Sequence, residues 1–293
     1  MVLSYIHPFG FDWLKPELMF VESHLGIQKW QFALILIALL LVHWKRNMLF
    51  LLLVVMAYQT QPAANTVPDQ RIALVTLHTP VEEKWNRDRH EAQFKILFNH
   101  IDHAVEQNKS IVVLPESVFP LYLNRTPSLL QKLQERAEQI NIVTGGLYWD
   151  GRTPRNATYI FTRDGKTEVA NKVLLVPFGE SNPLPDFLSD WVNRVFYDNA
   201  VDYKASGEIV DYRLEGTRYR NAICFEATSE ALYEGRPQRM IVLSNNGWFI
   251  PSTEPVLQRL LLQYYSKKYG TTIYHSVNMS PSYIIRAGEV LQP

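Results

Sequence analysis

Two apolar runs stand out near the start of the chain, at residues 30–44 and 48–58, with the basic pair Lys45 and Arg46 between them. Each run is shorter than the roughly 20 residues with which a helix spans a bilayer. One continuous span would place both basic residues mid-membrane, at a cost of about 2.5–3.5 kcal/mol each. We therefore expect a membrane-associated helical hairpin with the basic pair at its turn, rather than a pair of buried core helices.

The residues on either side of this hairpin differ from it in composition. Residues 1–29 are mixed and lack the basic start, apolar run and cleavage site of a secretory signal. Residues 59–70 are polar, contain Pro62 and Pro68, and are predicted to be a linker. Because Lys and Arg accumulate on cytoplasmic loops, we expect the hairpin turn in the cytoplasm and the rest of the chain across the membrane.

From residue 71 the pattern alternates between strands and helices. Apolar residues at helical spacing, such as Phe94, Leu97 and Ile101, predict a helix, whereas short β-branched runs predict buried strands. An Arg-Asp-Gly turn at 163–165 predicts a hairpin between two strands. The succession is typical of a layered α/β domain. The predicted strands are 71–77, 110–114, 141–149, 157–161, 166–176, 219–225, 240–244 and 272–277, and the predicted helices are 86–107, 128–139 and 255–269.

Charge and cysteine content narrow the function classes. Lys and Arg number 29, as do Asp and Glu, so no basic field favours a nucleic acid partner. A lone cysteine excludes an internal disulfide. His100 and His103 are three residues apart on a predicted helix, but no third metal ligand lies near them in sequence, and no glycine-rich loop could hold a nucleotide phosphate. We therefore expect neither a metal nor another cofactor.

The single cysteine, Cys224, ends a strand-like run and is followed two residues later by Glu226. A free cysteine is most often a small buried apolar residue, which is the competing interpretation. A strand that ends at the thiol would instead place it at the carboxyl edge of a sheet, where the sites of α/β proteins gather. A carboxylate so close by is also an unusual companion for a purely structural thiol.

Two further segments place ionisable groups beside apolar runs. Glu116 follows Ile-Val-Val-Leu-Pro, where it can be a turn acid or a general base. Lys172 precedes Val-Leu-Leu-Val, where it can be a solvated edge-strand lysine or a fixed cation beside an oxyanion. Glu180 follows Pro-Phe-Gly and can be an ordinary loop acid. A thiol, a carboxylate and an ammonium together suit nucleophilic attack on a carbonyl, provided that the fold brings them together.

These three segments carry a resemblance to a known superfamily. Leu-Pro-Glu116-Ser, Asn-Lys172 with Pro-Phe-Gly-Glu180, and Ile-Cys224-Phe-Glu226 resemble the signature segments of the nitrilase, or carbon–nitrogen hydrolase, superfamily. The resemblance implies a nitrilase-like αββα sandwich, here preceded by a short membrane helical segment.

Within this superfamily the chain is similar to the apolipoprotein N-acyltransferase family and to nitrilase-like proteins of conjugal transfer. The similarity covers about residues 71–290. It rests on Glu82-Glu-Lys-Trp85, on Val-Pro-Phe-Gly-Glu180 and on Leu-Ser-Asn-Asn-Gly-Trp248-Phe, besides the cysteine segment. The expected domains are an N-terminal segment at 1–29, the membrane hairpin at 30–58, the linker at 59–70 and a nitrilase-like catalytic domain at 71–293.

The resemblance implies a role for each matching residue. Glu116 would be the general base that takes the thiol proton, and Cys224 the nucleophile that forms a thioester. Lys172 and the backbone N–H of Phe225 would hold the oxyanion, and Glu180 would support the lysine. A lysine beside the thiol is also expected to lower the pKa of the thiol.

Other matching residues lie around this set. Glu226 would be a further supporting residue, and Trp85 and Trp248 would bind substrate. The chain departs from the family pattern after Phe249, where the expected Gly-Pro loop is missing, and after Asn278, where Met-Ser replaces Asn-Gly. It also ends before the family's last strands and closing membrane helix, which leaves two interpretations open: a fragment of a longer protein, or a divergent relative.

We expect a membrane-anchored acyltransferase or amidase that acts through a thioester on Cys224. The first hypothesis is N-acyl transfer in lipoprotein biosynthesis, from a phospholipid to a lipoprotein or peptide amine. The alternatives are an amidase acting on C–N bonds, a conjugal-transfer component, and a non-catalytic envelope assembly protein. The expected location is the bacterial inner membrane, with the catalytic domain facing the periplasm, and the oligomeric state stays open.

Overall fold

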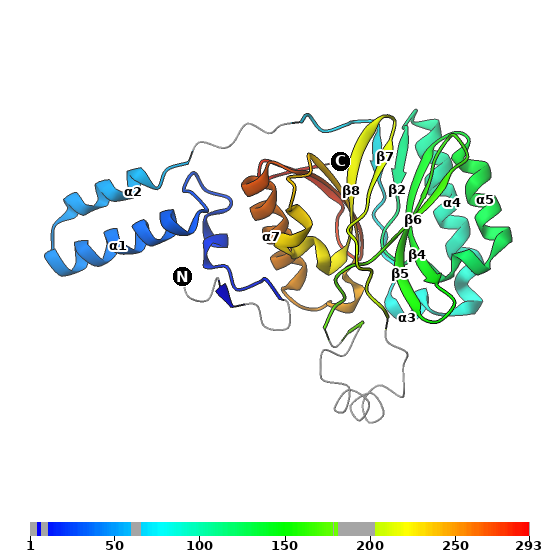
Figure 1. Cartoon of the computed structure of the whole chain (residues 1–293), viewed down its shortest axis with the longest axis horizontal. Helices are drawn as coiled ribbons and strands as arrows, with labels where there is room; N and C mark the ends of the chain where they lie inside the picture. The colour runs from blue at the N-terminus through cyan, green and yellow to red at the C-terminus, as the bar shows by residue number, and fades with distance from the viewer. Residues whose placement is uncertain (1–4, 7–10, 60–65, 178, 181–202, 293) are drawn as a thin grey trace, which may run out of the picture.

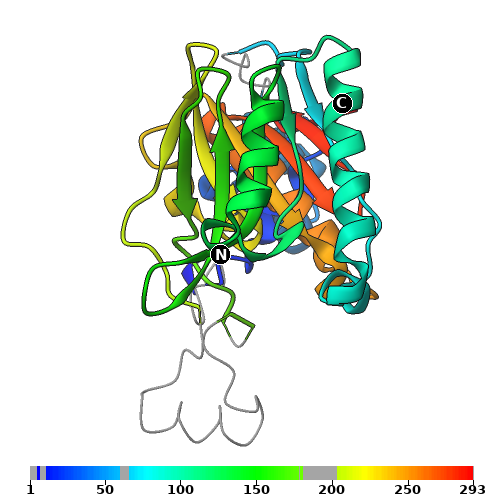
Figure 2. The same ribbon diagram turned by 90° about the vertical axis from the view of Figure 1, so that its right-hand side faces the viewer.

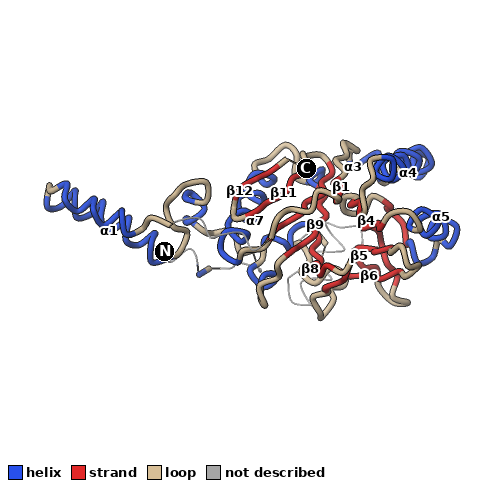
Figure 3. The backbone as a smooth tube through the Cα atoms, turned by 90° about the horizontal axis from the view of Figure 1, so that it is seen from above, coloured by secondary structure: helices blue, strands red, loops and turns tan. Residues whose placement is uncertain are grey.

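A computed structural model describes residues 5–6, 11–59, 66–177, 179–180 and 203–292. Two six-stranded sheets pack face to face, and helices cover their outer faces (Figures 1 and 3). The αββα sandwich expected from the sequence is therefore present. A helical hairpin projects from one end of this sandwich (Figure 1).

The first sheet is mixed, with parallel strands at one side and antiparallel strands at the other. Its order is β1 (Ile72–Leu74), β2 (Ile111–Val113), β4 (Asn141–Trp149), β5 (Pro154–Phe161) and β6 (Thr167–Asn171), and β3 (Phe119–Tyr122) pairs with β4. β1, β2 and β4 run parallel, whereas β4, β5 and β6 are antiparallel neighbours. Two long helices, α4 (His90–Glu106) and α5 (Pro127–Ala137), lie side by side on the outer face (Figure 2).

The second sheet has three parallel central strands. Its order is β12 (Glu289–Leu291), β11 (Tyr283–Arg286), β10 (Thr272–Asn278), β9 (Arg239–Asn245), β8 (Thr217–Ile223) and β7 (Asp211–Leu214). Because β8, β9 and β10 are parallel, their carboxyl ends at Ile223, Asn245 and Asn278 share one edge. The long helix α7 (Glu254–Tyr269) covers the outer face of this sheet.

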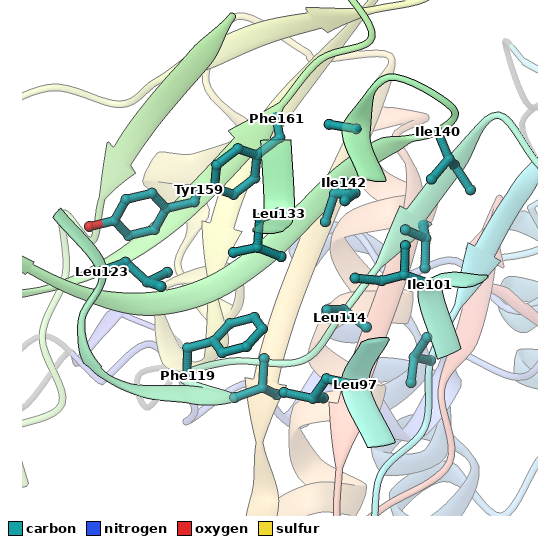
Figure 4. Packing of buried hydrophobic residues seen from close by; sticks show 14 of the residues in the cluster. Leu97, Ile101, Leu114, Phe119, Leu123, Leu133, Ile140, Ile142, Tyr159 and Phe161 are labelled. Carbon is teal, nitrogen blue, oxygen red and sulfur yellow. The ribbon is translucent and has the colours of Figure 1, made fainter. Parts of the chain in front are cut away.

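Three apolar clusters fill the spaces between the four layers. In the first, Leu97 and Ile101 of α4 and Leu133 of α5 pack on Phe119 and Ile142 of the first sheet (Figure 4). The second cluster lies between the two sheets and contains Val113, Val143, Tyr219, Ile241 and Leu243, and the third joins α7 to the second sheet and to Leu18, Val21 and Ile27. The cluster between the two sheets consists mainly of aliphatic strand residues, and strands such as β2 and β9 are buried on both faces, as their continuous apolar runs predict.

Short helices connect these elements. They are η3 (Pro16–Phe20), α3 (Val81–Lys84), η5 (Arg87–Arg89), η6 (Leu123–Arg125), η7 (Cys224–Thr228), η8 (Glu230–Tyr233) and η9 (Asn246–Trp248). Two of them, η7 and η9, begin at the carboxyl ends of β8 and β9, so the second sheet passes into tight turns at the same edge.

The strands differ from the sequence-based prediction mainly at their ends. The strand predicted at 219–225 ends at Ile223, because Cys224 has a positive φ of 53° and starts a 3₁₀ turn. The strand predicted at 166–176 ends at Asn171, so Lys172 follows the strand. The strand predicted at 71–77 is paired regularly only over β1. The short strands β3, β7, β11 and β12 were not predicted, since runs of three or four residues give little periodicity.

The apolar runs form a helical hairpin. α1 (Lys29–Lys45) turns at Arg46, which is left-handed, and the chain returns through η4 (Met48–Leu51) and α2 (Leu52–Met56). The base is closed by the N–H of Gly26, which donates to the carbonyl of Ala57 at 2.7 Å, and by the N–H of Gln59, which donates to the carbonyl of His24 at 2.9 Å. In the described part of the chain, no helix combines the length and the apolar character needed to cross a bilayer.

Candidate active site

Glu116 lies two residues beyond Leu114, where the chain leaves β2 at the carboxyl edge of the first sheet. Its carboxylate is buried and held from both sides. One oxygen accepts the backbone N–H of Asn245 at 2.9 Å, and the other accepts the side-chain amide of Asn156 at 2.8 Å. The carboxylate therefore joins the first sheet to the carboxyl end of β9 in the second.

Lys172 follows β6 and is 1% exposed, which excludes the solvated edge-strand alternative. Its Nζ lies 2.8 Å from Oε2 of Glu180 and 3.5 Å from Oε1 of Glu116. Burial alone would lower the pKa of Lys172, but the carboxylates of Glu180 and Glu116 outweigh that effect and raise the pKa above its ordinary value. The site thus holds a fixed, desolvated positive charge.

Asn156 on β5 is a site residue that the sequence analysis missed. Its Nδ2 donates to Glu116 and to Glu180, at 2.8 Å in each case. The amide therefore lies between two carboxylates that share one lysine, and it donates one N–H to each of them. A polar residue inside a strand gives no signal of this kind by itself, and only the pairing of β5 with its neighbours places Asn156 here.

Cys224 opens the 3₁₀ helix η7 and is buried. Its positive φ is a strained conformation for a residue with a side chain, and such conformations concentrate at functional sites. The Nε2 of Gln258, on α7, lies 3.8 Å from the sulfur.

Opposing effects act on the pKa of the Cys224 thiol. Burial, assisted by the charge of Glu116, raises the pKa of Cys224 above its ordinary value, and the opposing effect of Lys172 is smaller. Lys172 therefore acts on the thiol pKa in the expected direction, but burial and Glu116 outweigh it. A buried thiol that keeps its proton near neutral pH needs a base to become a nucleophile, and a carboxylate lies in the same site.

Glu226 is buried and holds the turn that carries the cysteine. One carboxylate oxygen accepts the N–H of Ile223 at 2.7 Å, and the other accepts the N–H groups of Val173 and Leu174 at 2.8 and 3.2 Å. Burial raises the pKa of Glu226 to about 7. The side chain thus ties the start of η7 to the backbone that follows Lys172, which is a supporting position.

One cavity of about 390 Å³ connects these groups. Glu116, Lys172, Glu180 and Cys224 all line it, as do Trp85, Tyr203, Trp248 and Phe249. Trp85 and Trp248 are partly exposed at this cavity, in keeping with the substrate-binding positions expected for them. The aromatic rings add apolar surface to the charged groups that line the cavity.

Lys84 is a second buried lysine that the sequence analysis did not single out. It lines the cavity, is 3% exposed, and donates from Nζ to the backbone carbonyl of Glu116 at 2.9 Å. Burial lowers the pKa of Lys84 to about 8, against the opposing effect of the Glu116 carboxylate. Its place beside Trp85, inside the Glu-Glu-Lys-Trp string, was the one available sequence signal.

The arrangement supplies the parts of covalent acyl chemistry. A thiol can attack a carbonyl, a carboxylate can move its proton, and a buried ammonium can stabilise the oxyanion. In the described residues, no group of three His, Cys, Asp or Glu side chains is placed to bind a metal ion.

Comparisons with known sequences point to one family. A model for the apolipoprotein N-acyltransferase integral membrane domain matches residues 1–61. The chain is 44% identical to an apolipoprotein N-acyltransferase of Wolinella succinogenes, over 97% of this chain and 70% of that protein. It is 33% identical to an apolipoprotein N-acyltransferase of Helicobacter pylori, over 96% of this chain and 68% of that protein.

Solved structures support the fold. A carbon–nitrogen hydrolase superfamily protein of Xanthomonas campestris superposes with a TM-score of 0.53 at 15% identity, covering 75% of this chain and 83% of that one. A branch 10 nitrilase-superfamily protein of Saccharomyces cerevisiae gives a TM-score of 0.55 at 17% identity, with the same coverage of 75% and 83%.

Proposed function

The chain belongs to the apolipoprotein N-acyltransferase family and is an N-acyltransferase of lipoprotein biosynthesis, and we propose that it works through a thioester on Cys224. The observation that carries this proposal is that Glu116, Lys172 and Cys224 line one cavity, although they come from three distant parts of the chain.

In the first half-reaction, the sulfur of Cys224 attacks an ester carbonyl of a phospholipid while Glu116 accepts the thiol proton. Lys172 and the N–H of Phe225 stabilise the oxyanion. The carbon–oxygen bond of the ester then breaks, Glu116 gives its proton to the departing alkoxide, and a lysophospholipid leaves. The acyl chain remains on the sulfur.

In the second half-reaction, the amino group of a lipoprotein attacks the thioester carbonyl. Glu116 accepts a proton from the amine and returns it to the sulfur as the carbon–sulfur bond breaks. The products are an N-acylated lipoprotein and the free thiol. This ping-pong scheme becomes hydrolysis if water replaces the amine, which is the amidase-like alternative.

We also propose where this chemistry takes place. The protein is a membrane protein by family, and the hairpin turn carries Lys45 and Arg46. With this turn on the cytoplasmic side of the bacterial inner membrane, the domain from residue 71 faces the periplasm. A reporter enzyme that is active only in the periplasm, fused after Gln70, should be active, and an inactive reporter beside an active control fusion would contradict the orientation.

The activity can be tested with purified protein in detergent, a phospholipid with a labelled acyl chain and a diacylated lipopeptide. Wild type should transfer the label to the lipopeptide amine, and Cys224→Ala and Glu116→Gln should each lose the transfer. Release of labelled free fatty acid at the same rate with and without lipopeptide would favour hydrolysis instead. Undiminished transfer by Cys224→Ala would overturn the thioester scheme.

A further inference from the structure

The segment that precedes the membrane hairpin contacts the turn that carries Cys224. The indole N–H of Trp13 donates to the hydroxyl of Thr228 at 2.9 Å, across 215 positions of sequence. That hydroxyl in turn donates to the backbone carbonyl of Phe225 at 2.7 Å. A continuous hydrogen-bonded path therefore runs from Trp13 to the residue directly after the cysteine.

The ring of Phe225 is held by the same segment. Its centroid lies 4.9 Å from that of Phe11 and 5.9 Å from that of Trp13, and the rings are inclined at 64° and 59°. Phe11 and Trp13 also pack edge to face on each other, at 5.0 Å. Inclined arrangements of this kind are favourable beyond the area they bury. Phe225 is thus fixed through its ring as well as through its carbonyl.

The segment is itself anchored to the catalytic domain. Lys267 of α7, buried, donates from Nζ to the carbonyls of Val21 and Ser23 at 3.2 and 2.9 Å. Asp12 pairs with Lys15 at 2.7 Å and accepts a hydrogen bond from the hydroxyl of Tyr265. The segment that carries Trp13 is therefore bound to α7 while Trp13 itself contacts the η7 turn.

We infer that Trp13 and Thr228 are positioning residues for the reaction, which hold the η7 turn so that the N–H of Phe225 points at the oxyanion. The inference rests on the proposed function. Glu226 ties the start of the same turn to the N–H of Ile223, and Trp13 contacts the end of the turn through Thr228. The support comes from within residues 1–61, the part that matches the family's membrane domain.

The expected effect follows from the sensitivity of such sites to geometry. Losing an oxyanion donor outright costs about 100- to 1,000-fold in rate, and a displacement of about 1 Å can cost as much as 100-fold. Loosening the turn displaces the donor without removing it. We therefore expect a loss of about 10-fold in the rate constant for thioester formation, with the KM for phospholipid unchanged.

The test compares variants that change one hydrogen bond each. Trp13→Phe keeps a ring against Phe225 but loses the donor, and Thr228→Val keeps the shape but loses the hydroxyl. Thr228→Ser restores the hydroxyl and should return the rate to within about twofold of wild type. The control is Thr126→Val, which removes a hydroxyl that donates to the carbonyl of Tyr122 at 3.1 Å, before α5.

The measurement is single-turnover formation of the Cys224 acyl adduct by full-length protein in detergent, with the thermal midpoint recorded for every variant. Trp13→Phe and Thr228→Val should each be slow, and the double variant no slower than either, because both act through one path. Thr126→Val should acylate at the wild-type rate.

Two outcomes overturn the inference while leaving the proposed function in place. The first is wild-type acylation rates in folded Trp13→Phe and Thr228→Val. The second is a fall in the thermal midpoint of these variants with no fall in the rate constant, since that is the signature of a purely structural contact. If wild type itself forms no adduct, the proposed function fails instead, so the two failures are distinguishable.

Discussion

Asn156 sets the electrostatics of the site at the scale of single residues. It donates to Glu116 and Glu180, which both contact Lys172. Asn156→Asp preserves the shape but replaces two donors with a third negative charge. We expect thioester formation to slow by about 100-fold, equivalent to about 2.7 kcal/mol, because two charge-assisted hydrogen bonds are lost and the carboxylates repel.

The measurement for Asn156→Asp is the single-turnover acylation rate beside that of wild type. Gln134→Glu on α5, which changes an exposed amide that donates to Thr167, is a matched control for adding one negative charge. A rate for Asn156→Asp within threefold of wild type would show that the amide does not hold the carboxylates in a productive arrangement.

The raised pKa of Glu226 predicts that the stability of the fold depends on pH. Burial raises the pKa of its carboxyl from an ordinary 4.5 to about 7, so the native state holds a proton that the unfolded chain releases. The stability that the protonated Glu226 carboxyl contributes is fully present below about pH 4.5, and it is lost as pH rises through about 7. Glu226→Gln cannot titrate, and its stability should therefore fall less than that of wild type across this window, by on the order of 1–3 kcal/mol.

Thermal unfolding in detergent from pH 4.5 to 8 measures this difference. Burial, with the charge of Glu116, also raises the pKa of Glu254 to about 7, but that contribution is common to both proteins and cancels in the comparison. Parallel pH profiles for wild type and Glu226→Gln would rule out a raised pKa at this position.

The sequence identified some site residues and not others for a physical reason. Glu116, Lys172 and Cys224 each interrupt or border an apolar run, which makes a charged or reactive group conspicuous. Asn156 and Gln258 lie within a strand and a helix as ordinary polar residues. Only the pairing of strands and the packing of α7 give them their places beside the carboxylates and the sulfur.

At the level of elements, β4 passes close behind the loop that carries Glu116, the proposed base. A Cβ on Gly145 would lie 2.3 Å from the backbone nitrogen of Ser117 and 2.7 Å from Cα of Glu116. Gly145→Ala must therefore displace the loop that carries Glu116, because backbone atoms cannot move aside as the end of a flexible side chain can. We expect a destabilisation of about 1–3 kcal/mol and at least a 10-fold slower acylation.

Gly207→Ala is the matched control, because a Cβ there meets no atom within 4 Å. It should leave the thermal midpoint and the acylation rate close to those of wild type. Equal behaviour of the two variants, in both measurements, would mean that β4 does not fix the position of Glu116.

The order of the elements was predictable, but several of their boundaries were not. Periodicity located the long helices α4, α5 and α7 and the buried strands, because each hides a continuous face. It extended β8 to Phe225, since apolar residues continue past the point where Cys224 turns the backbone left-handed. A left-handed backbone conformation at a single residue leaves no trace in a hydrophobic pattern.

At the level of the whole molecule, the helical hairpin projects away from the sandwich (Figure 1) and exposes apolar side chains. Its large exposed apolar side chains include Leu40, Trp44, Leu49, Leu52 and Val55. Such a surface suits lipid, in keeping with the family's integral membrane domain. Leu40→Arg with Val55→Arg should weaken membrane retention, because each buried charge costs about 2.5–3.5 kcal/mol at the membrane centre.

The fraction of protein that stays in the membrane pellet after an alkaline wash reports this retention. Ile96→Arg, at an exposed position on α4 of the catalytic domain, is the matched control, and the same fraction of it as of wild type should stay in the pellet. Full retention of the double arginine variant would mean that these two positions do not face lipid.

Intact mass spectrometry detects a thioester on Cys224 without relying on any later step of the reaction. Wild type incubated with a phospholipid and no amine acceptor should gain the mass of one acyl chain on Cys224, and neutral hydroxylamine should remove it. Cys224→Ser should carry no such hydroxylamine-labile acyl group. An unmodified wild-type cysteine, under conditions in which the same preparation transfers acyl chains to a lipopeptide, would contradict the account.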